Sequence, residues 1–172
     1  MPRPMEILQE LTPQRLVKLY ADDVWRFASS KLRRKEDAED AAMETFSAAI
    51  REFAKLKKAD SPRLWLLAIA RNKVHDAMRK QYRRAETALE ENLSVEADDE
   101  SSRRESLHQA MAEMPELHRE ILVLKYVNGL STEEVSRVIR KSAGATNSLL
   151  QRARNSLRER AQPLLEPQGG TL

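Results

Sequence analysis

The chain has no cysteine, four glycines and 5 % aromatic residues among its 172 residues. Without cysteine there is no disulfide, no thiol nucleophile and no cysteine-ligated zinc, and such a composition fits a reducing compartment. Glycine and aromatic residues are scarce while 33 % of the residues are charged, a balance that argues against a β-sandwich or barrel. The composition therefore favours a helical protein.

Long apolar runs are also missing from the sequence. No segment approaches the ~20 consecutive apolar residues that a membrane-spanning helix needs. The N-terminal stretch MPRPMEILQELTPQ has no apolar core of the kind found in signal peptides. We therefore expect a cytoplasmic protein with no membrane insertion.

The residue constellations of common enzymes are not found either. The three histidines, His75, His108 and His118, are scattered, and none has a second histidine four residues away as a helical metal site would. There is no glycine-rich phosphate loop, and the clustered acids have no paired base. We expect no catalytic residue, no cofactor and no metal.

What is present is an uneven distribution of charge. Residues 51–84 hold eleven basic and three acidic residues, and residues 137–160 hold seven basic and one acidic residue. Between these blocks, residues 86–105 hold eight acidic residues and two arginines. Two basic blocks suggest two contacts with a polyanion such as nucleic acid, although solvated helix faces would give a similar pattern.

The first half has the signals of three helices. Apolar residues recur at three- and four-residue spacings over residues 13–32 and 36–56. Ser61 followed by Pro62 is typical of a helix start, with serine as the N-cap and proline in the first turn. A third helix from there to Arg84 would complete one unit over residues 1–84. Residues 85–103 lack an apolar period and are interpreted as an acidic linker.

The second half, residues 104–162, has the signals of several short helices. Ser131 and Glu134 stand three residues apart before an apolar run, which is the spacing of a capping box. A tight turn with Ser142 as a candidate cap leads to a last helix that opens with small residues. This pattern is typical of a helix-turn-helix, although an ordinary helical hairpin also fits it. Residues 163–172 are expected to be a disordered tail.

Motifs in both halves carry a family resemblance. The sequences DAED, ETF and WLLAIARN lie within residues 37–72, and MPEL, LSTEEV and SLLQRAR lie within residues 114–154. They resemble regions 2 and 4 of the extracytoplasmic-function (group 4) sigma factors of bacterial RNA polymerase. The resemblance implies an all-α protein of two small helical domains joined by the acidic linker. It also implies a subunit without chemistry of its own that directs promoter-specific transcription initiation.

In that family, region 2 docks on a coiled coil of the polymerase's largest subunit. The resemblance assigns core-polymerase binding to Asp37, Glu39, Asp40, Met43 and Glu44. Their acidic cluster stands beside a strongly basic helix, which suits a protein interface. Helix-start acids that complement the macrodipole would explain all of it except Glu44. Met43 departs from the glutamine that is usual in the family.

Region 2 of the family also recognises and melts the minus-ten element, with a loop that captures an unstacked base. The matching positions are Lys57, Lys58, Asp60, Ser61, Arg63, Trp65, Arg71, Asn72, Lys73, Arg79 and Lys80. Basic side chains suit a strand backbone, and an aromatic ring offers a stacking surface. Trp65 lies in an apolar run, however, which favours a place in the core. Pro62 stands where the family often has a second aromatic residue.

Region 4 of the family places a recognition helix in the major groove of the minus-thirty-five element. The matching outward positions are Asn147, Ser148, Gln151, Arg152 and Arg154. Asparagine and glutamine favour adenine edges, and arginine favours guanine. Leu149 replaces a residue that is commonly basic. Arg140 replaces a common glycine at the turn, where a positive φ would be costly for any other residue.

The resemblance implies core polymerase, bound at its largest-subunit coiled coil and its flap, and promoter DNA as partners. An anti-sigma factor is a candidate further partner. Two other functions stay open from the residues alone. A stand-alone helix-turn-helix regulator would bind duplex DNA as a dimer, for which the sequence offers no evident surface. A sigma-like adaptor would bind only proteins and would tolerate loss of the basic residues.

Overall fold

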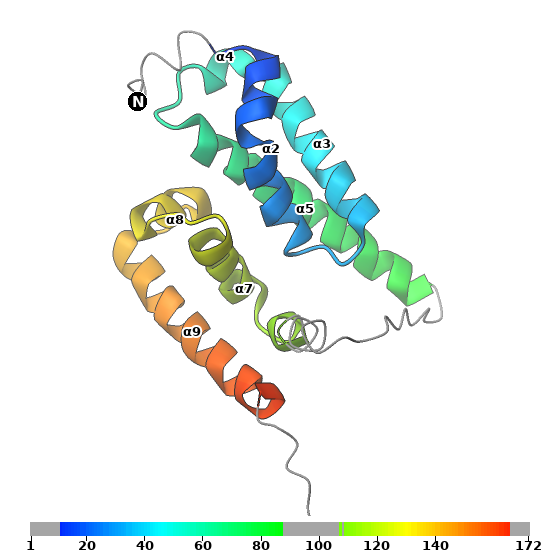
Figure 1. The fold of residues 1–172 in the computed structure, drawn as a ribbon, viewed down its shortest axis with the longest axis vertical. Coiled ribbons are helices and arrows are strands. Elements are labelled where there is room, and N and C mark those ends of the chain that lie inside the picture. Colours follow the sequence, from blue (N-terminus) through cyan, green and yellow to red (C-terminus); the bar gives the residue numbers. More distant parts are fainter. Residues whose placement is uncertain (1–10, 88–106, 108, 166–172) are drawn as a thin grey trace, which may run out of the picture.

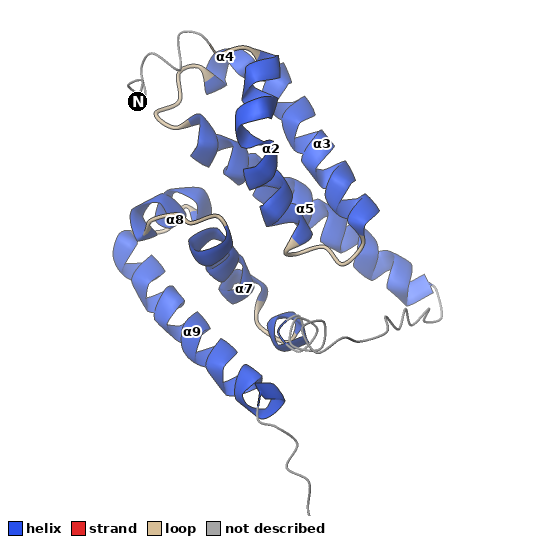
Figure 2. Cartoon of the chain, in the orientation of Figure 1, coloured by secondary structure: helices blue, strands red, loops and turns tan. Residues whose placement is uncertain are grey.

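A computed structural model describes residues 11–87, 107 and 109–165 of the chain. The described residues form helices and connecting loops, with no strand among them (Figure 2). Most of the acidic linker and the end of the tail lie outside these ranges. The helices gather in two units, which we call the N-terminal unit (residues 11–87) and the C-terminal unit (residues 109–165) (Figure 1).

The N-terminal unit is a bundle of three long helices and one short one. They are α2 (Pro13–Ser29), α3 (Lys35–Arg51), α4 (Phe53–Leu56) and α5 (Pro62–Thr87). Helix α2 begins at the Thr12 hydroxyl, which accepts a hydrogen bond from the backbone of Arg15 at 3.2 Å. The second predicted helix, over 36–56, is divided at Glu52, where the backbone leaves the helical region (φ −105°, ψ 25°).

Helices α2, α3 and α5 pack on each other around one apolar centre. Phe27, Leu66 and Leu67 are fully buried there, and α3 contributes mainly alanines. Small side chains on α3 let the three helices approach closely, which compensates for the scarcity of aromatic residues. The bundle holds both the acidic face of α3 and the basic helix α5 in fixed positions.

The C-terminal unit contains the predicted helix-turn-helix. Its elements are a helical turn at residues 109–112, α7 (Glu116–Leu122), the π-helix η1 (Val123–Val127), α8 (Thr132–Ile139) and α9 (Ala143–Leu165). The capping box at α8 is confirmed, since Ser131 Oγ accepts from the Glu134 amide at 3.1 Å and Glu134 Oε2 accepts from the Ser131 amide at 2.8 Å. The π-helical stretch after α7 was not predicted.

Two helices run past their predicted ends. Helix α5 continues to Thr87, so the first residues of the predicted 85–103 linker are helical. Helix α9 continues to Leu165 and includes the start of the predicted disordered tail. Since Pro163 lies in this last turn, the proline did not end the helix as the sequence suggested. The remaining parts of the linker and tail lie outside the described residues.

The two units are packed against each other (Figure 1). Helix α8 contacts α5, and η1 contacts α2. The buried apolar residues of both units form one continuous cluster. The sequence predicted two helical domains joined by a linker, and this direct contact between them is an addition to that picture.

Candidate nucleic-acid interface

The outward face of α3 presents the residues predicted to bind polymerase. Asp40 is exposed and, among the described residues, forms no ion pair, and Met43 is 71 % exposed. Glu44 lies 3.5 Å from the ammonium group of Lys73 on α5. Asp37 is half-buried and accepts a hydrogen bond from Gln81 at 2.8 Å. The centre of the predicted surface is therefore open, whereas two of its carboxylates contact α5.

Glu39, the remaining residue of that predicted surface, is exposed. Its carboxylate lies 3.7 Å from the ammonium of Lys35 one helical turn earlier. Exposed pairs of this kind contribute little to stability, about 0.3–0.5 kcal/mol. The side chain therefore remains available to a partner.

The loop before α5 carries several predicted minus-ten residues. Lys57, Lys58 and Asp60 are exposed, and the Lys57 ammonium lies 5.5 Å from the ring centre of Phe53. Ser61 is turned inward, where its hydroxyl accepts from the amide of residue 64 at 3.4 Å and caps α5. The two lysines thus project from the start of the basic helix.

Trp65 does not stand out from the surface as a free stacking platform. It is half-buried and packs against the hydrophobic core. The placement agrees with its position in an apolar run. Pro62, where the family often has an aromatic residue, is buried.

The predicted minus-ten residues of α5 differ in exposure. Asn72, Arg79 and Lys80 are exposed, although Arg79 lies 3.7 Å from Asp76 of its own helix. A shallow groove between α3 and α5 includes Lys73, Arg79 and Lys80 in its lining. By contrast, Arg63 and Arg71 are engaged in ion pairs.

The helix-turn-helix has the geometry that its sequence predicted. Arg140 ends α8 in the left-handed region, at φ 56° and ψ 49°. Ser142 Oγ then accepts from the amide of residue 145 at 3.2 Å and caps α9. Thr146 and Leu150 are buried against the rest of the unit. The five predicted minus-thirty-five positions are all exposed: Asn147, Ser148, Gln151, Arg152 and Arg154.

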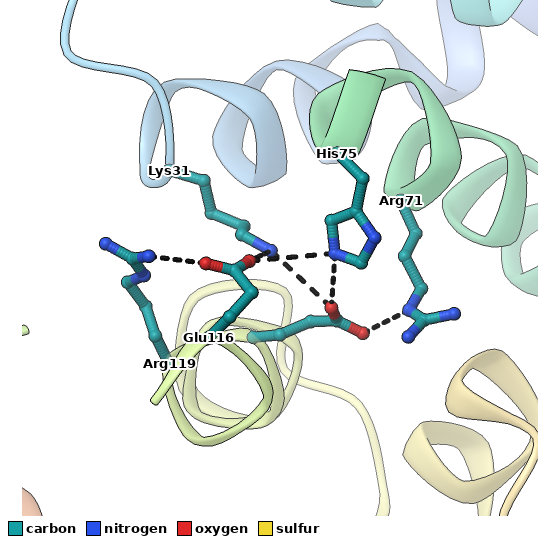
Figure 3. Close-up of polar contacts among 6 residues, drawn as sticks. Lys31, Arg71, His75, Glu116 and Arg119 are labelled. Atoms are coloured by element: carbon teal, nitrogen blue, oxygen red, sulfur yellow. Dashed lines mark hydrogen bonds and ion pairs between the residues drawn. The ribbon is translucent and has the colours of Figure 1, made fainter. Parts of the chain in front are cut away.

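A group of charged residues, of which the sequence had assigned a role only to Arg71, joins the two units (Figure 3). Lys31 and His75 come from the N-terminal unit and Glu116 from α7, with Arg71 on the far side of the group. Glu120 accepts from Arg71, lies 2.9 Å from His75 Nε2 and 3.5 Å from Lys31 Nζ.

Both glutamates of this group are ionised more readily than free glutamates. Burial opposes ionisation of Glu120, but the His75 hydrogen bond and the charges of Lys31 and Arg71 outweigh it and lower its pKa. The pKa of Glu116 is lowered in the same way, with burial opposed by Lys31 and Arg119. The contact between the units therefore stabilises the ionised form of both glutamates.

A second polar contact joins the units around Arg63. Its guanidinium donates two hydrogen bonds to the carboxylate of Asp23, at 2.7 and 2.8 Å, and a third to the carbonyl of Asn128 at 2.6 Å. The Asn128 amide in turn donates to the Asp23 carbonyl at 2.9 Å. Burial opposes ionisation of Asp23, but Arg63 outweighs it and the pKa of Asp23 lies below its usual value.

The first of these contacts superficially resembles a metal site. Ligand atoms of His75, Glu116 and Glu120 lie within 4.8 Å of one another. However, the ammonium of Lys31 contacts both carboxylates, and Arg71 contacts one of them. These cations already compensate the negative charge that would attract a metal ion.

The sequence carried a weak signal for this group. Glu116 and Glu120 stand four residues apart in a predicted apolar helix, so they share one face. Of the partners of Glu120, His75 and Arg71 lie 45 and 49 residues away along the chain, and Lys31 lies farther still. Such partners can be found only from the tertiary structure.

Together these features define a two-module helical protein with a polar helix-turn-helix surface in one module and a basic helix beside an acidic face in the other. Residues 16–84 match the family model of sigma-70 region 2, and residues 104–157 match that of sigma-70 region 4. None of the described helices combines the length and hydropathy needed to cross a bilayer.

Curated relatives agree with the two family models. The chain is 30 % identical over 156 residues to the ECF RNA polymerase sigma factor SigM of Bacillus subtilis, covering 86 % of this chain and 94 % of that protein. It is 33 % identical over 152 residues to the ECF sigma factor BldN of Streptomyces coelicolor, covering 83 % of this chain but only 58 % of that protein.

A solved structure shares the fold. The sigma factor RpoE of Bartonella quintana, in complex with the anti-sigma factor NepR, matches with a TM-score of 0.71 and 23 % identity, covering 90 % of this chain and 98 % of that chain. The chain belongs to the extracytoplasmic-function sigma factors, which serve RNA polymerase in transcription initiation. The identification made from the sequence motifs is thereby confirmed.

Proposed function

We propose that the two modules have different roles in transcription initiation. Region 2, residues 1–84, docks on the largest-subunit coiled coil of core polymerase through α3 and melts the minus-ten element with α5 and its preceding loop. Region 4, residues 104–162, reads the minus-thirty-five element with α9 and contacts the polymerase flap. The acidic linker joins the two, and the protein itself catalyses no reaction.

The observation that carries the docking proposal is the exposed, unpaired centre of α3. Asp40 forms no ion pair with any described residue, and Met43 beside it is 71 % exposed. Methionine is enriched at protein interfaces, and an unpaired carboxylate beside it can pair with a basic residue of a partner. A basic and apolar partner surface would complement both side chains.

Asp40→Arg is the sharpest test of this docking. Since Asp40 has no described partner, its reversal should leave the fold intact while opposing a basic partner surface. We expect at least a tenfold loss of affinity for core polymerase, measured by fluorescence anisotropy of the labelled full chain. Glu159→Arg, at an exposed position on α9, is the control with the same charge change. Unchanged affinity of Asp40→Arg would refute the assignment.

The promoter-reading proposal is tested by run-off transcription with core polymerase and a promoter library. We expect initiation above that of core polymerase alone. Neutralising the exposed Arg79 and Lys80 together should weaken binding to minus-ten DNA, because phosphate contacts depend on these charges. A variant that initiates as well as the parent would exclude these residues from the minus-ten surface.

An anti-sigma factor is a further proposed partner, and the cytoplasm is the proposed location. The similar RpoE structure was solved with the anti-sigma factor NepR, which supports the first suggestion. The second follows from the family, since a sigma factor must meet polymerase and promoter DNA. Co-purification from cells with a mild cross-linker would test both the partner and core polymerase in one experiment.

A further inference from the structure

The second half of α5 carries an exposed tyrosine among basic residues. Tyr82 is 70 % exposed and lines the groove between α3 and α5, two helices that run side by side (Figure 1). It forms no hydrogen bond or ring contact with any described residue. A tyrosine combines an apolar ring with a hydroxyl that donates a hydrogen bond. The side chain therefore suits a partner that offers an apolar surface next to a hydrogen-bond acceptor.

The groove has a positive charge that its own acids do not fully compensate. Its charged lining consists of four basic and two acidic residues: Lys73, Arg79, Lys80, Arg83, Glu44 and Asp76. Glu44 pairs with Lys73 at 3.5 Å, and Asp76 pairs with Arg79 at 3.7 Å. Lys80 forms no ion pair with any described residue. Four positive charges against two negative ones leave an excess that attracts a polyanion.

The helical period arranges this charge as a row along α5. Lys73, Lys80 and Arg83 recur at intervals that place them on one face of the helix. From residue 73 to residue 83 the helix rises by about 15 Å, which is the length of roughly four base pairs of DNA. A row of this length can follow several consecutive phosphates of one strand. Nucleic acid is thus the polyanion that fits the groove.

The groove lies far from the loop that precedes α5. Tyr82 follows Pro62, the first residue of α5, by 20 residues, which is about 30 Å along a helix and the length of roughly nine base pairs. In the proposed function this loop holds unpaired bases, and melting extends from there toward the transcription start. DNA at the opposite end of α5 is therefore still paired, and it lies on the side of the minus-thirty-five element.

We infer that the groove between α3 and the second half of α5 binds the backbone of duplex DNA upstream of the minus-ten element. The inference rests on the proposed function and extends it, because regions 2 and 4 are there assigned only to the two promoter elements. Arg79 and Lys80 lie where minus-ten DNA passes into this spacer, and Tyr82 and Arg83 are the contacts farthest upstream. The Tyr82 hydroxyl donates to a phosphate, and its ring packs on the neighbouring sugar.

Region 4 leaves this groove open. It contacts α5 through Arg63, Arg71 and His75, which lie in the first half of the helix. Lys80 and Tyr82 in the second half are exposed. Because backbone contacts carry no base information, the groove strengthens promoter binding whatever the sequence of the spacer.

The inference is tested with two DNAs and the holoenzyme assembled from core polymerase and the full chain. Both DNAs carry the minus-ten element with an unpaired downstream strand and lack the minus-thirty-five element. One ends directly upstream of the minus-ten element, and the other continues as duplex for about ten base pairs. Tyr82→Ala combined with Arg83→Ala should weaken binding of the longer DNA about tenfold, because two phosphate contacts are lost. Binding of the shorter DNA should stay at the parent value.

Tyr126→Ala combined with Arg158→Ala is the matched control, since it removes the same two side-chain types from exposed positions of region 4. Its ratio of affinities for the two DNAs should equal that of the parent. Equal weakening of both DNAs by the Tyr82 and Arg83 substitutions would place these residues on the minus-ten element, and unchanged binding of both would leave the groove without DNA. Either result overturns the inference. A parent holoenzyme that binds neither DNA would refute the proposed function itself.

Directed cleavage locates the contact along the DNA. The chain has no cysteine, so Tyr82→Cys and Lys58→Cys each create a single attachment point for an iron chelate that cuts nearby DNA backbone. Cuts from position 82 should fall in the upstream duplex, roughly nine base pairs from those made from position 58 in the loop before α5. Cuts at the same base pairs from both positions would overturn the inference.

Discussion

Arg140 holds a backbone conformation that usually belongs to glycine. It is the only non-glycine residue with a positive φ in the described ranges, at φ 56° and ψ 49°. Arg140 lies in the turn between α8 and the recognition helix α9. Its amide donates a hydrogen bond to the Arg137 carbonyl at 3.4 Å. The left-handed conformation costs an L-residue roughly 1–2 kcal/mol. This cost is a local destabilisation at the centre of the DNA-binding motif.

Substitutions at Arg140 should separate backbone strain from side-chain contacts. Arg140→Val should lower the free energy of unfolding by about 1–2 kcal/mol, because a β-branched residue is least tolerant of positive φ. Arg140→Gly should raise it by up to about 1 kcal/mol, since relief of strain exceeds the extra entropy of the unfolded chain. Urea unfolding followed by circular dichroism measures both. Equal destabilisation by both substitutions would point to lost arginine contacts instead.

The contrast between Arg140 and Glu120 shows which residues could be understood from the sequence. The strained turn and the Ser131–Glu134 capping box depend on neighbours within a few positions, so their chemistry was predictable. Glu120 owes its burial to side chains that are distant along the chain, with Arg71 49 residues away and Lys31 farther still. Its partners depend on how two separate helical units meet, which no local pattern encodes.

The recognition helix α9 presents its polar residues to solvent along one face. Thr146, Leu150 and Ala153 are buried, whereas Gln151 and Arg152 between them are exposed. The 3.6-residue period of a helix separates these two sets, so the sequence predicted the outward face correctly. The π-helix η1 was not predicted because π-helical turns are rare and occur mostly as short bulges inside α-helices. The sequence thus predicted that helices form here, but it did not predict the π-helical turn.

Arg152→Ala should distinguish base reading from phosphate binding on this helix. If Arg152 contacts a guanine edge, its loss should cost about 1–3 kcal/mol of binding to the preferred minus-thirty-five sequence. The loss should be confined to that sequence, as measured with a set of single-base variants in the presence of core polymerase. Arg158→Ala, exposed further along α9, is the matched control. A uniform loss over all sequences would make Arg152 a phosphate contact.

The described residues of regions 2 and 4 pack against each other as one body. Its buried apolar residues form a single cluster that crosses from region 2 to region 4. The sequence placed an acidic linker between the two basic blocks and so predicted the division into domains. It could not predict their contact, because the surfaces that meet include charged residues that would be equally suited to solvent.

Two carboxylates of region 4 make this contact sensitive to acid. Glu116 and Glu120 have pKa values below their usual range. Burial opposes the ionisation of each, but neighbouring cations and hydrogen bonds outweigh it. A carboxyl whose pKa is depressed by the contact between the regions stabilises that contact fully above its ordinary pKa, about 4. The stabilisation is then lost as the pH falls through the depressed value.

With one dye at Lys18→Cys on α2 and one at Asn155→Cys on α9, both exposed positions, energy transfer between the regions should therefore stay constant from pH 8 to about pH 5 and fall below about pH 4. Protonated Glu116 and Glu120 no longer attract Lys31 and Arg71, so the contact between the regions weakens. Far-UV circular dichroism recorded in parallel should show the helices persisting where transfer is first lost. Glu120→Lys sets a cation against Lys31 and Arg71, so we expect its regions to be apart already at neutral pH and its energy transfer to change little further. Transfer that falls only together with helicity would mean that acid unfolds the regions rather than separating them.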